Sequence, residues 1–132
     1  MNEPAAQMWL QYTHLDKLYG YLPGMPEALP AIFGLTPNEY ADITARFDAH
    51  ARDAAVELLT DHSFTADIDA LPFRPNQTVL AVGDSVTDDA QSWVEILRHA
   101  LHIRRTTNGV HIVNGGLSAH TTAMVLRRWP AC

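Results

Sequence analysis

The sequence predicts an α/β fold, in which a parallel sheet with helical crossovers follows an N-terminal helical extension. Residues 1–75 place their apolar side chains mostly at helical spacing, whereas residues 76–132 alternate short apolar runs with helical patterns. That alternation, strand–helix–strand–helix, is typical of parallel strands joined by crossover helices. Prolines at positions 72 and 75 mark the boundary. We therefore divide the chain into an extension, 1–75, and the start of an α/β domain, 76–132.

The first half is expected to be helical around one irregular connector. The best-defined start is Thr36-Pro37-Asn38-Glu39, which offers a capping hydroxyl, a proline in the first turn and a glutamate three residues after the cap. The expected elements are a helix over 8–22, an irregular connector over 27–35, and helices over 37–60 and 64–71.

The second half begins with a buried strand over 78–83, whose apolar run ends in a turn. Thr87 then offers an N-cap hydroxyl for a helix with one apolar face. A glycine pair at 115–116 should break the second strand. The expected elements are a helix over 88–103, a turn at 108–109, a strand over 110–114, and a last helix from Thr121 or Thr122 through Trp129, stopped by Pro130.

The candidate chemistry lies in the run Gly83-Asp84-Ser85, directly after the first strand. Ligands of open α/β sheets bind at the carboxyl ends of the strands. A serine at that position lies beside backbone N–H groups, an arrangement that suits a nucleophile requiring an oxyanion hole.

Two blocks of sequence carry a resemblance to a known family. Gly83-Asp84-Ser85 with Thr87-Asp88 resembles the first motif block of the SGNH/GDSL hydrolases, which include esterases, lipases and thioesterases. One helix and one strand later, residues 113–122 resemble the family's Asn-x-Gly-x-Ser-Gly-x-Thr-Thr block. The resemblance covers about 78–130 and implies a flavodoxin-like α/β sandwich, or its first half.

This resemblance implies hydrolysis of a small-molecule ester through an acyl-enzyme, without a cofactor. Ser85 would be the nucleophile, and its backbone N–H group one oxyanion donor. The second donor would be the backbone N–H group of Ala119, which stands where the family has glycine. The substitution is harmless unless the backbone requires positive φ, in which case the hole is distorted. Asn114 and Asp84 are expected to support the turn and the nucleophile loop.

The sequence lacks the other blocks of the family. It contains no Asn-Asp pair, which would supply a third oxyanion donor, and none of its seven histidines follows an aspartate by three residues. The base and the remaining strands are therefore expected from a completing chain segment or a second copy of the chain. Within the sequence, His120 is the local candidate for the base.

Two alternatives remain open. Gly83 to Asp88 also resembles the metal-binding loop of haloacid-dehalogenase-type phosphatases, where Asp84 and Asp88 would hold magnesium and Asp67-Ile68-Asp69 would supply the nucleophile. Against this, no strand precedes residues 67–69. The other alternative is a catalytically inactive fragment or an interaction module of the same fold.

The composition argues against several classes of protein. The net charge is −6 and no basic stripe occurs, which argues against nucleic-acid binding. No apolar run approaches the ~20 residues of a membrane span. The single cysteine, Cys132, favours a reducing compartment, so we expect a cytoplasmic protein. The spacing of His99 and His102 lacks a third metal ligand, and the aromatic residues Trp9, Tyr12, Tyr19 and Tyr21 are expected to pack in the core.

Overall fold

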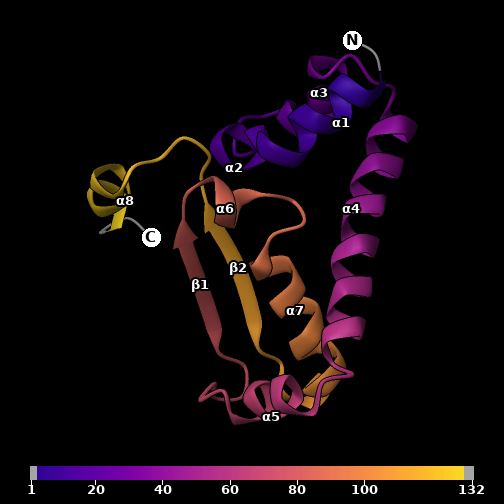
Figure 1. The fold of residues 1–132 in the computed structure, drawn as a ribbon. Coiled ribbons are helices and arrows are strands. Elements are labelled where there is room, and N and C mark those ends of the chain that lie inside the picture. Colours follow the sequence, from indigo (N-terminus) through magenta and orange to yellow (C-terminus); the bar gives the residue numbers. More distant parts are fainter. Residues whose placement is uncertain (1–2, 130–132) are drawn as a thin grey trace.

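The computed structural model describes residues 3–129, which form a small parallel sheet with helices on one face (Figure 1). The strands β1 (Thr78–Gly83) and β2 (His111–Gly116) pair in parallel, from Thr78 opposite His111 to Gly83 opposite Gly116. The expected α/β class and both strands are therefore confirmed. Because the strands end together, the two loops that follow them leave from the same edge of the sheet.

The helices form layers around this sheet. Helix α7 (Trp93–Arg104) packs on one face, and the long helix α4 (Pro37–Leu58) packs against α7 on the side away from the strands (Figure 1). At the carboxyl ends of the strands lie α1 (Glu3–Tyr12), α2 (Leu15–Tyr19) and α3 (Met25–Ile32). The other helices are α5 (His62–Ala70) at the opposite end, α6 (Ser85–Asp88) after β1, the 3-10 turn η1 (Thr106–Asn108), and α8 (Thr122–Arg128).

The apolar core consists of two clusters at opposite ends of α4. The cluster at the carboxyl end of the sheet joins α1, α3 and α4, and the other joins α4, α5 and α7. The buried residues are Leu10, Leu29, Phe33, Ile43 and Phe47 in the first cluster and Ala55, Ile68, Ala100 and Leu101 in the second.

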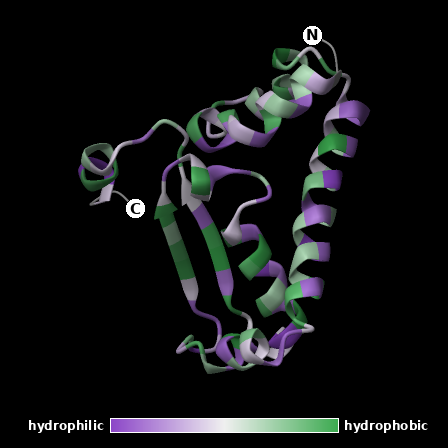
Figure 2. Ribbon diagram, viewed as in Figure 1, coloured by the Kyte–Doolittle hydropathy of each residue, from purple (hydrophilic) through white to green (hydrophobic). Residues whose placement is uncertain are grey.

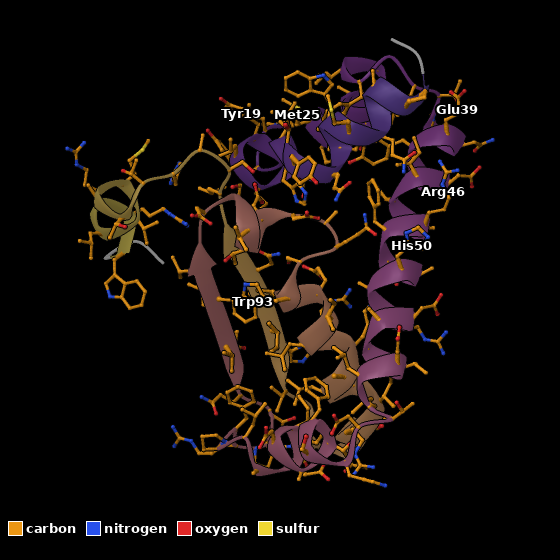
Figure 3. The ribbon with its side chains drawn as sticks, viewed as in Figure 1. Tyr19, Met25, Glu39, Arg46, His50 and Trp93 are labelled. Carbon is orange, nitrogen blue, oxygen red and sulfur yellow. The ribbon has the colours of Figure 1, made fainter. Side chains whose placement is uncertain are left out.

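A polar contact also joins α4 to the loop before α7. Figure 3 labels His50 on α4, below Arg46, and the Nδ1 atom of His50 is 3.1 Å from Oε1 of Gln91 in that loop.

The face of the sheet opposite α7 is open. Leu80 and Val113, which pair across the strands on that face, are 39% and 46% exposed, and both strands are hydrophobic along much of their length (Figure 2). Within residues 3–129, neither strand has a second neighbour. Helix α8 stands beside β1, where Arg128 donates a hydrogen bond of 3.1 Å to the carbonyl oxygen of Gly83. Among the same residues, no helix has the length and hydrophobicity to cross a bilayer.

The prediction of a single helix over 8–22 is wrong, because the helical conformation is interrupted at Thr13 and His14, between α1 and α2. The last carbonyl groups of α1 accept hydrogen bonds from residues distant in sequence, in place of the N–H groups that a continuing helix would supply. The N–H group of Ala90 donates to the Gln11 carbonyl at 3.0 Å, and Ser118 Oγ donates to the Tyr12 carbonyl at 2.7 Å. These donors replace the intrahelical partners that the break removes.

The irregular connector expected over 27–35 is also wrong, since α3 covers most of it. Gly24 takes the left-handed conformation as the N-cap with φ of 78°, and Pro26 lies in the first turn, where its missing N–H group costs nothing. Pro30 interrupts the helix interior, but it and Leu29 are buried, so packing offsets the lost hydrogen bond.

The helix expected over 88–103 is divided. Asp84, not Thr87, caps α6, and α7 starts only at Trp93, after Ser92. Thr87 is itself buried, so its hydroxyl is unavailable as a solvent-side cap. The glycine pair does not break the second strand, which continues to Gly116 because that residue packs against the backbone of Thr87 and Asp88.

The expected starts of α4 and α8 are confirmed, whereas α5 begins at His62, two residues before the expected start at Phe64. Thr36 and Glu39 form both halves of a capping box, and α4 ends two residues before the expected limit. Asp61 caps α5, Thr121 caps α8 through a hydrogen bond from the Met124 N–H group, and the expected turn at 108–109 is present with Gly109 at φ of 59°. Pro130, the expected stop for α8, lies outside the described residues.

Candidate functional site

Ser85 starts α6, in the turn that follows β1. The Asp84 side chain shapes this turn, because its carboxylate accepts a hydrogen bond of 3.0 Å from the Val86 N–H group, and its carbonyl accepts from the N–H groups of Thr87 and Asp88. Asp84 therefore has the supporting role that we expected. Ser85 is exposed, and its hydroxyl makes no hydrogen bond to any described residue. The hydroxyl is free to meet a substrate.

Ala119 lies in the loop after β2, which leaves from the same edge of the sheet. The N–H group of Leu117 donates to the Gly83 carbonyl at 3.1 Å and so joins the two loops. Ala119 has φ of 63°, a conformation that favours glycine. Because the backbone does use positive φ, this is the case in which we expected alanine to distort the loop. The described structure keeps the positive φ with alanine in place, so the substitution shows as strain at Ala119, which is itself exposed.

A buried carboxylate connects the turn after β1 to this loop. Asp88, which is 1% exposed, accepts a hydrogen bond of 2.8 Å from the N–H group of Ser118, and the Ser118 hydroxyl, whose proton this carboxylate shares with the Tyr12 carbonyl, lies at the same distance. Its other oxygen is 2.6 Å from Nζ of Lys17, which comes from α2. Because Ser118 directly precedes Ala119, this group of three residues, the Lys17–Asp88–Ser118 clamp, fixes the position of the Ala119 N–H group.

Electrostatics favour the ionised form of Asp88. Burial acts to raise the pKa of this carboxyl group, but the hydrogen bonds from Lys17 and Ser118 and the charge of His14, whose Nδ1 is 3.7 Å away, outweigh it. The net result is a pKa below the usual value for aspartate. The clamp is therefore a buried ion pair at neutral pH.

Asn114 ties the clamp to α7. Its amide nitrogen donates to the Thr87 carbonyl at 2.7 Å and to Glu95 Oε1 at 3.0 Å. Its amide oxygen accepts from the N–H group of Gly116 at 3.0 Å and from Lys17 Nζ at 3.2 Å. Every polar atom of this side chain is used, as expected for a residue that supports the turn.

Sequence reasoning missed Lys17 and its neighbours on the N-terminal helices. Gln11 Nε2 reaches both carboxylate oxygens of Asp89, at 3.2 and 3.1 Å, next to the Lys17–Asp88 contact. One signal was available: Lys17 is the only lysine in the chain. A lone lysine on an otherwise acidic and apolar helical segment is a candidate partner for a buried acid.

The histidines do not form a metal centre. Among residues 3–129, no group of three or more His, Cys, Asp and Glu side chains is arranged to hold a metal ion. His99 is buried with Nε2 3.0 Å from Asp48, while His102 is exposed. His120 lies next to Ala119, and its Nδ1 is buried and hydrogen-bonded to none of the described residues.

The residues that the phosphatase hypothesis needs are far apart. Asp67 and Asp69 lie on α5 at the amino end of β1, whereas Asp84 and Asp88 lie beyond its carboxyl end (Figure 1). A six-residue strand separates them by roughly 20 Å. In addition, Asp69 pairs with Arg104, and both oxygens of Asp88 are engaged in the clamp. These four aspartates therefore do not form the site that a phosphatase of this type requires.

Two pockets flank the Ala119 loop. One, of about 250 Å3, lies between the N-terminal helices and the loop, and Tyr12, Leu18, Leu117 and Ala119 line it. The other, of about 270 Å3, lies on the Asp84 side of the loop. His120 lines both of them. The four N-terminal aromatic residues expected in the core are instead half-exposed to fully exposed, which leaves Tyr12 available as a pocket wall.

Comparison with known proteins gives no match: no family model, no curated protein and no solved structure is similar to this chain.

Proposed function

We propose that this chain carries the nucleophile and oxyanion loop of a serine ester hydrolase of the SGNH/GDSL type, built on a flavodoxin-like sheet. The observation that supports the proposal best is the common exit of the two motif loops. Ser85 and Ala119 follow strands that end in register, and a hydrogen bond from Leu117 to Gly83 joins their loops. An exposed serine, whose hydroxyl is unpaired among the described residues, thus lies at the same sheet edge as the exposed residue Ala119.

In the proposed reaction, Ser85 Oγ attacks the ester carbonyl carbon and forms a new C–O bond, while its proton passes to a base. The N–H groups of Ser85 and Ala119 stabilise the negative oxygen of the tetrahedral intermediate. The bond to the alcohol oxygen then breaks, and the alcohol leaves with the proton from the base. Water, activated by the same base, releases the acid and regenerates the serine.

The base is an imidazole, which we assign to a completing segment or a second copy of the chain. The open sheet face with Leu80 and Val113 and the outer edges of both strands, which no strand of residues 3–129 pairs with, give such a segment a place to pack. His120 is the alternative source within the chain.

Labelling with a fluorophosphonate tests the proposal. The folded chain is treated with the probe, with and without added imidazole as an external base, and the adduct is located by intact mass and peptide mapping. We expect an adduct on Ser85 that forms faster as imidazole is added. Ser85→Ala should abolish it, whereas Ser63→Ala, an exposed serine on α5, should label like the unchanged chain.

Two outcomes would separate the alternatives. An imidazole-independent adduct that His120→Gln removes would assign the base to His120. The absence of any Ser85 adduct on folded protein, even with imidazole, would contradict the proposal and favour an inactive interaction module. The exposed apolar residues of the sheet face are the feature that favours that second function.

A further inference from the structure

The N-terminal helices and the loop after β2 enclose a pocket that the proposed reaction has not yet used. It holds about 250 Å3 and is lined by Tyr12, Thr13, Leu18, Leu117, Ala119 and His120, among others. We infer that this pocket, the helix–loop pocket, binds the acyl chain of the ester. The inference rests on the proposed function, because it takes Ala119 as an oxyanion donor.

The free surface of the pocket is apolar even though charged residues stand behind it. Asp88 and Ser118 also border it, but their polar atoms are engaged in the clamp, and the positive charge of Lys17 neutralises the carboxylate. His14 is occupied by a contact of 3.3 Å between Nε2 and the Gln11 carbonyl. What remains for a ligand is mainly the side chains of Tyr12, Leu18 and Leu117, which suit an uncharged hydrocarbon chain.

The position of Ala119 sets the direction of the ester. Its N–H group would bind the carbonyl oxygen, which would place the carbonyl carbon between the helix–loop pocket, lined by Ala119, and the second pocket, lined by Asp84, the residue before Ser85. The acyl group stays on the serine through both chemical steps, whereas the alcohol leaves after the first. The helix–loop pocket is the more enclosed of the two, so it takes the acyl chain, and the open pocket takes the alcohol.

His120 supplies an independent observation at this junction. Its Nδ1 is buried but finds no hydrogen-bond partner in the described part of the chain. Buried polar atoms are nearly always paired, so we expect this nitrogen to gain a partner, a water molecule or a ligand oxygen, when the two pockets that His120 lines are filled. An ester oxygen at the mouth of the pocket is an acceptor for the Nδ1–H tautomer.

The volume limits the length of the acyl chain. An apolar cavity of ~150 Å3 holds the six carbons of a benzene molecule, so by proportion about 250 Å3 holds a chain of up to roughly ten carbons, and a longer chain would extend out of the pocket into water. The substrate class is therefore an ester of a medium-length, uncharged fatty acid.

A series of p-nitrophenyl alkylphosphonates with ethyl, hexyl and dodecyl chains tests this inference. The rate at which each forms an adduct with Ser85 is followed by intact mass, with imidazole present. We expect the hexyl probe to react at least tenfold faster than the other two, because a single methylene group in an apolar pocket can change the rate about tenfold and the hexyl and ethyl chains differ by four. Leu18→Trp, which fills the pocket from an exposed position, should remove this preference, whereas Leu126→Trp on α8 should not.

A binding measurement distinguishes failure of the inference from failure of the proposed function. The ketone 2-octanone is titrated into the chain, and the His120 ring signals are followed by NMR. Equal adduct rates for all three probes would overturn the acyl pocket and leave the nucleophile in place. If no probe reacts but 2-octanone shifts the His120 signals, the pocket stands and the hydrolase proposal falls. Absence of both effects would overturn both.

Discussion

Replacing Ala119 with glycine is expected to stabilise the protein. Alanine at φ of 63° carries a steric penalty of about 1–2 kcal/mol, which glycine avoids. Glycine also gains conformational freedom in the unfolded chain, which costs about 0.5–1 kcal/mol on folding. The difference is a net gain in the free energy of unfolding of about 0.5–1 kcal/mol.

This gain is large enough to measure. With an unfolding entropy of about 2.1 cal/mol/K per residue, a chain of 132 residues should show a rise in Tm of roughly 2–4 °C. Urea denaturation followed by far-UV circular dichroism gives the same quantity as a shift in the midpoint at constant slope. Because the N–H group stays in place, labelling of Ser85 should be unchanged or faster.

Ala49 provides the matched control. It is exposed in the middle of α4, so Ala49→Gly makes the identical chemical change in a helical backbone and should destabilise by about 0.5–1 kcal/mol. The two variants are thus expected to shift stability in opposite directions. If Ala119→Gly lowered stability as much as Ala49→Gly does, the positive φ and the strain argued from it would be refuted.

Three further predictions concern the support of the site and the longest helix. Asp88→Asn should lower the free energy of unfolding by about 2 kcal/mol or more at pH 7, because Lys17 loses its buried counter-charge. Since the folded pKa of Asp88 is depressed, this loss of stability should persist above pH 4 and shrink as the pH falls below it. A loss that did not change with pH would contradict the ion pair. Gly116→Ala should cost about 2 kcal/mol or more, because its Cβ would lie 2.6 Å from the Thr87 carbonyl carbon. Gly115→Ala should cost less, because the atom nearest its Cβ belongs to the movable Leu80 side chain and the nearest backbone atom, the Ala81 carbonyl oxygen, is 3.1 Å away; equal urea midpoints for the two variants would refute this. Thr36→Ala should cost about 1 kcal/mol by removing the capping box, and an unchanged thermal midpoint would show that α4 does not depend on it.

The elements that sequence predicted well are those with local causes. The capping box at Thr36 and the apolar run of β1 act within a few residues, so their boundaries follow from the printed sequence. The break between α1 and α2 has a distant cause, since the donors that replace the helix come from Ala90 and Ser118. No local pattern carries that information.

The candidate site likewise has one part that local sequence predicts and another that depends on distant contacts. The positions of Ser85 and Ala119 at one sheet edge follow from strand periodicity and the parallel register. The clamp could not be predicted in this way, because the sequence around Asp88 looks the same as that of a solvent-exposed aspartate at the start of a helix. Only the contact with Lys17, 71 residues away, distinguishes them.

The clamp also orders events during synthesis. Lys17 and Ser118 lie about 100 residues apart, and a ribosome adds roughly 5–20 residues per second, so the N-terminal helices wait on the order of 5–20 s for the loop that they bind. During this delay Gln11 and Lys17 have neither Asp89 nor Asp88 as a partner until the nascent chain passes β1. The candidate site is therefore assembled last, and a ribosome that stalls before position 88 leaves α1 and α2 docked at most on their own apolar cluster.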